Sequence, residues 1–102
     1  MTESATFQME ADRDRAVLTL LPKLNQIAWA DIEHVGSQMI SRIGGMSNPK
    51  VLVDLTSLEY MGSAQLALVV RLFKLIKEKN GAMVVANRHP MVLEVLTLAG
   101  LN

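Results

Sequence analysis

The sequence contains no cysteine, few aromatic residues and no long apolar run. The absence of cysteine excludes disulfide bonds, thiolate metal sites and cysteine nucleophiles, and it is typical of proteins from a reducing compartment. No apolar stretch approaches the roughly 20 residues of a membrane-spanning helix, and residues 1–15 lack the apolar segment of a signal peptide. We therefore expect a cytoplasmic protein that does not insert into a membrane.

The charges are balanced, with ten Lys and Arg against ten Asp and Glu. Because no segment gathers basic residues among aromatic ones, a nucleic-acid partner is not expected. A chain of 102 residues is long enough for one hydrophobic core, and half of its residues are hydrophobic. We expect residues 1–102 to form a single α/β domain whose core is mainly aliphatic.

The apolar periodicity predicts the element order β-β-α-β-α-β-α. The expected elements are strands at 5–10 and 16–21, a helix from about 29 to 43, a strand at 51–55, a helix at 63–79, a strand at 82–86, and a last helix that opens at Pro90 and closes before Gly100. The first two strands should form an antiparallel hairpin, and the later strands should be parallel in one mixed sheet. Because the strands at 51–55 and 82–86 are mostly apolar and lack a regular alternation of apolar and polar residues, we expect both to be buried on both faces.

The most informative segment runs from Leu52 to Ser63, where a strand passes through a turn and delivers a serine to the start of a helix. A helix N-terminus carries free backbone N–H groups and a partial positive charge, which favour an anion such as a phosphate. A simpler interpretation is that Ser63 caps the helix, since serine is a preferred N-cap residue.

The segment from Val51 to Leu72 resembles the signature of STAS domains, the family of bacterial anti-sigma factor antagonists. Two further segments, Asn80–Ala86 and Val95–Leu101, are similar to the family's glycine-then-strand element and to its last helix end. The resemblance spans nearly the whole chain and implies the STAS-like α/β fold. It also implies that the chain lacks the family's C-terminal strand and helix. An uncovered sheet edge or helix surface could then support a homodimer.

The resemblance implies a regulatory interaction module that is not an enzyme. Ser63 falls at the family's phosphorylation site, and the partner would be an anti-sigma factor or serine kinase-like regulatory protein that itself holds ATP, so no cofactor is expected in this chain. The unphosphorylated form would bind and phosphorylation would release it. The residues expected to contact the partner are Asn25, Met61, Gly62, Ala64, Gln65 and Leu68.

Three positions depart from the family pattern. Gly62 stands where the family has an aspartate, Gln65 where it has a glycine, and Asn25 where it has an acidic residue. The departures at Gly62 and Asn25 favour a second hypothesis, a non-phosphorylated scaffold or an accessory subunit of a signalling complex or lipid-transport ATPase. A third hypothesis is a ligand-binding or catalytic domain with an apolar pocket near Asp54 and Ser63.

The remaining polar residues suggest no catalytic or metal site. Asp54 is expected to accept backbone hydrogen bonds in the turn that follows its strand. His34 and His89 have no metal-ligand neighbour at a suitable spacing. Trp29 is expected at the edge of the core, with a partner-facing role as the alternative.

The helix at 63–79 has an apolar arc of about 220°, wider than one buried face requires. Leu68, Leu72 and Leu75 should therefore pack under a neighbouring helix or meet a partner.

Overall fold

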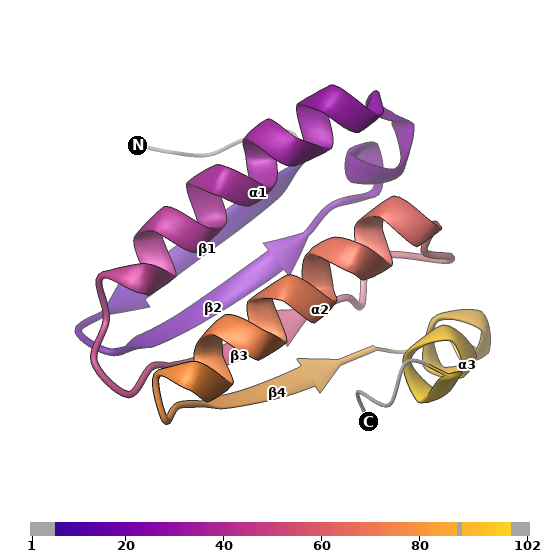
Figure 1. Ribbon diagram of the computed structural model, residues 1–102. Helices are drawn as coiled ribbons and strands as arrows, with labels where there is room; N and C mark the ends of the chain where they lie inside the picture. Colours follow the sequence, from indigo (N-terminus) through magenta and orange to yellow (C-terminus); the bar gives the residue numbers. More distant parts are fainter. Residues whose placement is uncertain (1–5, 88, 99–102) are drawn as a thin grey trace.

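The computed structural model describes residues 6–87 and 89–98, shown in Figure 1. Its elements, in chain order, are β1 (Phe7–Asp12), β2 (Arg15–Leu20), the 3₁₀ helix η1 (Pro22–Gln26), α1 (Trp29–Gly44), β3 (Lys50–Asp54), α2 (Ser63–Glu78), β4 (Ala82–Ala86) and α3 (Pro90–Leu98). The predicted order of strands and α-helices is confirmed. η1 was not predicted. The two hairpin strands extend closer to the turn between them than the predicted ranges of 5–10 and 16–21. Gly100 lies outside the described residues.

The four strands form one sheet in the order β1-β2-β3-β4. β1 and β2 are antiparallel, whereas β2, β3 and β4 are parallel, so the predicted mixed sheet is confirmed. The carboxyl ends of the three parallel strands meet at one end of the sheet. η1 and the first turns of α1 and α2 gather at that same end (Figure 1).

α1 and α2 lie side by side on one face of the sheet (Figure 1). Alternate strand residues on this face are buried, because successive side chains of a strand point to opposite faces. The buried core that joins the sheet to the helices includes Phe7, Leu18, Leu20, Val51, Val53, Met39, Ile43, Leu72 and Ile76.

The prediction that β3 and β4 are buried on both faces is wrong. Leu52 of β3 is 37% exposed and Val84 of β4 is 62% exposed, because α1 and α2 cover only the other face. An apolar run shows that a strand can be buried, but it does not show which of its faces a helix covers. Trp29 is also more exposed than expected, at 62%, and does not form an edge of the core.

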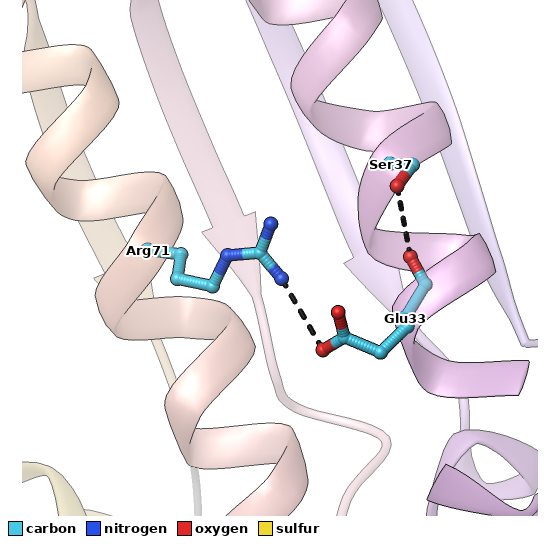
Figure 2. A network of polar contacts seen from close by, with 3 residues as sticks. All are labelled: Glu33, Ser37 and Arg71. Atoms are coloured by element: carbon cyan, nitrogen blue, oxygen red, sulfur yellow. Dashed lines mark hydrogen bonds and ion pairs between the residues drawn. The ribbon is translucent and has the colours of Figure 1, made fainter. Parts of the chain in front are cut away.

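The two long helices meet closely at Gly36 of α1 and Leu68 of α2. A side-chain Cβ at Gly36 would lie 2.9 Å from Leu68 Cδ1, and Leu68 and Leu72 are both buried. At the surface of the same contact, Arg71 of α2 forms an ion pair with Glu33 of α1 at 3.5 Å (Figure 2). The expectation that Leu68 packs under a neighbouring helix is therefore confirmed. Leu72 is buried in the core, and Leu75 is partly buried against it.

The end of α2 follows the sequence closely. Asn80 adopts the left-handed conformation with φ 58°, and the Gly81 N–H donates to the Ile76 carbonyl at 2.8 Å. A Cβ at Gly81 would lie 2.1 Å from the Pro49 carbonyl oxygen, so only glycine fits there. The predicted end of this helix at about residue 79 is confirmed, and the left-handed residue that ends it is Asn80.

Candidate functional site

The loop between β3 and α2 is fixed at both ends, and it brings Ser63 to the carboxyl end of the sheet. At its start, Asp54 Oδ1 accepts hydrogen bonds from the Thr56 N–H at 2.9 Å and the Thr56 hydroxyl at 2.6 Å. This bears out the prediction that Asp54 stabilises the turn after its strand. Leu55, Leu58 and Met61 of the loop are buried in the core. The path of the loop is thus set by packing along most of its length.

Ser63 is the first residue of α2 and its side chain is exposed. The N-cap position belongs to Gly62, in an extended conformation, and no side chain donates or accepts a capping bond there. The hypothesis that Ser63 caps the helix is therefore wrong, because the N-cap is the preceding residue, Gly62. The serine hydroxyl lies on the surface beside the free N–H groups of the first turn.

Two hydrogen bonds join η1 to the segment around Ser63. Gln65, which is 5% exposed, donates from Nε2 to the Leu24 carbonyl oxygen at 2.8 Å. Asn25 donates from Nδ2 to the Tyr60 carbonyl oxygen at 3.0 Å. η1 and the start of α2, about 40 residues apart in sequence, therefore form one surface.

Gly62 and Gln65 are sterically linked. A Cβ at position 62 would lie 2.6 Å from Gln65 Oε1, which is far too close. Gln65 cannot simply move away, because its Nε2 bond to Leu24 holds the buried side chain in place. The glycine at 62 and the glutamine at 65 are thus one combined departure from the family pattern.

The structure separates the residues that were expected to contact a partner. Ser63 is exposed, and Asn25, Gly62 and Ala64 are partly exposed, so these four are accessible. Met61, Gln65 and Leu68 are buried, and their assignment as contact residues is corrected. The side chains of Met61 and Leu68 pack in the core, and the Gln65 amide bonds to Leu24 inside the domain.

Two aromatic side chains are exposed at this end of the molecule; the sequence analysis missed Tyr60 and gave a partner-facing Trp29 only as the alternative to a core edge. Trp29 begins α1 and is 62% exposed, and Tyr60 lies three residues before Ser63 and is 50% exposed. Exposed tryptophan and tyrosine are common anchors of protein interfaces. Their exposure could not be read from the sequence, because a lone aromatic residue fits a core edge equally well.

A hollow of about 350 Å³ lies between η1 and the loop before α2. Its lining residues are Pro22, Asn25, Gln26, Ser57, Glu59 and Tyr60. Asn25 Oδ1 is buried and has no hydrogen-bond partner in the described part of the chain. Neither Asp54 nor Ser63 lines the hollow, so it does not match the apolar pocket that the ligand-binding hypothesis requires.

Two other features are absent from residues 6–87 and 89–98. Among these residues, no group of three or more His, Cys, Asp and Glu side chains could hold a metal ion. None of the described helices is long and apolar enough to cross a membrane.

A mixed sheet with two long helices on one face and an exposed serine at the first turn of α2 defines a small α/β domain. The profile of the STAS domain matches residues 8–102, and the chain belongs to this family. No curated protein matches the chain.

Solved structures of STAS proteins have the same fold. The anti-sigma factor antagonist SpoIIAA in its unphosphorylated form superposes with a TM-score of 0.76 at 21% identity, over 93% of this chain and 81% of that one. The phosphorylated form of the Bacillus cell fate determinant SpoIIAA superposes with a TM-score of 0.68 at 24% identity, over 93% of this chain and 84% of that one. An anti-sigma-factor antagonist (STAS) domain protein from Planctomyces limnophilus superposes with a TM-score of 0.70 at 26% identity, over 93% of this chain and 82% of that one.

Proposed function

We propose that this protein is a regulatory interaction module that binds an anti-sigma factor or a related serine kinase-like regulator, and that phosphorylation of Ser63 releases the partner. The observation that carries the proposal is the exposed position of Ser63 at the first residue of α2. The exposed aromatic side chains of Trp29 and Tyr60 at the same end of the molecule support a docking role for this surface.

A phosphate at Ser63 would change binding without unfolding the domain. It adds a charge of roughly −1.5 to −2 and three acceptor oxygens, which the first turn of a helix accommodates well. The same charge and bulk would obstruct a partner that packs over the hydroxyl. SpoIIAA, a protein of the same fold, has been solved in an unphosphorylated and a phosphorylated form.

The first test is phosphorylation of the purified protein by the kinase-like regulator encoded beside it, with ATP. We expect intact mass spectrometry to detect one added phosphate, which peptide mapping assigns to Ser63. Ser63→Ala should abolish the modification. Ser57→Ala changes another exposed serine of the same loop and should leave it intact. Phosphorylation of the Ser63→Ala protein would count against the switch, and so would a native protein that is not phosphorylated.

The second test is partner binding by isothermal calorimetry. We expect Ser63→Asp to weaken binding at least tenfold and Ser63→Ala to retain it, since only aspartate adds charge to the contact. Ser57→Asp adds the same charge elsewhere in the loop and should have a smaller effect. Equal affinities for Ser63→Asp and the native protein would exclude Ser63 from the interface.

A second candidate function is a constitutive scaffold, or an accessory subunit of a signalling complex or lipid-transport ATPase. It is favoured by the neutral side chains at Asn25 and Gly62, which replace acids that a family kinase would meet beside the phosphoacceptor. Under this alternative the native protein binds its partner but carries no phosphate under any growth condition. Phosphate-affinity gels of cell extracts distinguish the two functions.

A further inference from the structure

The sheet face opposite α1 and α2 carries apolar side chains where a water-facing sheet normally has polar ones. Val17, Leu52 and Val84 lie directly opposite one another in the register of β2, β3 and β4. They are 38%, 37% and 62% exposed and form a continuous row across the sheet. The two other residues of β4 on this face, Ala82 and Ala86, are small and apolar. We call this surface the open face.

Opposite charges flank the apolar row on β3. Lys50 and Asp54 lie two positions on either side of Leu52, and strand alternation places all three on the open face. Lys50 is exposed and Asp54 is partly exposed. The bonds from Thr56 both reach Asp54 Oδ1, which leaves the second carboxylate oxygen to accept from a cation.

We propose that the open face binds a second copy of this chain, with a twofold axis that crosses the strands at Leu52. This axis makes the two β3 strands antiparallel, so that Lys50 of each copy lies opposite Asp54 of the other. The apolar rows then face each other, as in two sheets packed about 10 Å apart. A twofold axis along β3 would instead place Lys50 on Lys50 and Asp54 on Asp54, which electrostatic repulsion disfavours.

One like-charge contact remains in the proposed arrangement. Glu10 of β1 pairs with Val17 and therefore ends the apolar row. The two copies of Glu10 would approach each other at the rim, two strands from the centre. Water and salt screen such exposed charges, so this contact lowers the affinity without preventing the association.

The size of the open face predicts a weak dimer. Four strands of about 4.8 Å spacing and five or six residues of about 3.4 Å rise give roughly 350 Å² of flat area per copy. This is below the roughly 800 Å² per partner of a standard stable interface. We therefore expect dissociation at low micromolar concentration and association at hundreds of micromolar.

The dimer would leave the Ser63 surface accessible. Because the two β3 strands run in opposite directions, the carboxyl ends of the two sheets, and with them the two Ser63 residues, lie at opposite ends of the assembly. The inference therefore does not depend on the function proposed for Ser63, and Ser63→Asp should not change the oligomeric state.

The test is sedimentation equilibrium of the full chain from about 10 to 500 μM. We expect the apparent mass to rise from 11.2 kDa toward twice that value. Leu52→Lys should weaken the association at least tenfold. Leu93→Lys changes an apolar residue of similar exposure on α3 and should have little effect. Circular dichroism verifies that both variants are folded.

The position of Leu52 also separates face packing from pairing of sheet edges. β3 is an interior strand with neighbours on both sides, so its backbone is not available to another chain. A dimer insensitive to Leu52→Lys would therefore use a sheet edge or another surface, and would overturn the proposal. A constant mass of 11.2 kDa throughout the concentration range would overturn it as well.

A charge exchange tests the proposed axis. Lys50→Asp alone and Asp54→Lys alone should each weaken self-association, since each places like charges opposite each other. In an equimolar mixture of the two variants, both contacts again join a lysine to an aspartate, and the heterodimer should form at least as readily as the native dimer. A mixture that associates no better than the separate variants would exclude this axis.

Discussion

Gly62 and Gln65 show how two residues near a functional serine act as one unit. Gln65 spans from α2 to the Leu24 carbonyl of η1, and its Oε1 occupies the space that any side chain at position 62 would need. Gly62 has an ordinary extended backbone conformation, so the requirement for glycine is steric and not conformational. The surface around Ser63 therefore depends on a buried glutamine that no partner can contact directly.

We predict that the effect of Gly62→Ala changes sign with residue 65. In the native background the new Cβ would disturb the bond from Gln65 to Leu24, and the free energy of unfolding should fall by about 1 kcal/mol. In a Gln65→Ala background the space is free, and replacement of glycine should raise stability by about 0.5 kcal/mol through the unfolded state. Urea denaturation of the four proteins measures both effects. Equal effects in the two backgrounds would show that the two positions are independent.

The contact between α1 and α2 combines a close apolar approach with a polar bridge on its surface. Gly36 is buried and lets Leu68 pack against the α1 backbone. The ion pair between Glu33 and Arg71, in contrast, joins two side chains that are each about half exposed, at 3.5 Å (Figure 2). Exposed ion pairs contribute about 0–1 kcal/mol, so the apolar approach should dominate the stability of this contact.

A pair of glycine substitutions in α1 tests this ranking. Gly36→Val should lower the free energy of unfolding by about 1–3 kcal/mol, because the new side chain would displace the buried Leu68 from its place in the core. Gly44→Val, in the same helix, should change it by less than about 0.5 kcal/mol, since a Cβ there meets no atom within 4 Å. Glu33→Ala should cost about 1 kcal/mol or less. Thermal and urea denaturation measure all three. A loss for Glu33→Ala that exceeds the loss for Gly36→Val would reverse the ranking.

Over the whole molecule, one face of the sheet and the two long helices share a single core. Strand residues from the hairpin and helix residues from α1 and α2 belong to the same buried cluster, as do Val92 and Leu96 of α3. Because no second core exists among the described residues, the elements should unfold together as one cooperative unit.

We predict a single unfolding transition that Leu72→Ala shifts without splitting. Leu72 is fully buried at the centre of α2, and its truncation should cost about 2–5 kcal/mol. Far-UV circular dichroism is the suitable probe. The fluorescence of Trp29, which is already 62% exposed, should change little on unfolding. Two separate transitions would indicate that α3 or the hairpin unfolds independently.

Local sequence chemistry predicted the backbone elements well. The strand at Lys50–Asp54, the turn held by Asp54 and the helix that begins at Ser63 follow from hydrogen bonds between near neighbours and from apolar periodicity. η1 was missed because a 3₁₀ helix of five residues is too short to show a periodicity. The N-cap of α2 is Gly62 and not Ser63, because glycine as well as serine is accepted at that position.

The sequence by itself therefore determined the order of strands and helices, the aliphatic core and the family, and it directed attention to Ser63. The tertiary structure alone decided that Gln65 is buried and bound to Leu24, that Trp29 and Tyr60 are exposed, and that one face of β3 is open. The physical reason is the sequence separation of the residues that interact. Backbone conformation depends on residues within a few positions of each other, whereas burial and accessibility depend on segments some 40 residues apart that meet only when the sheet and helices pack.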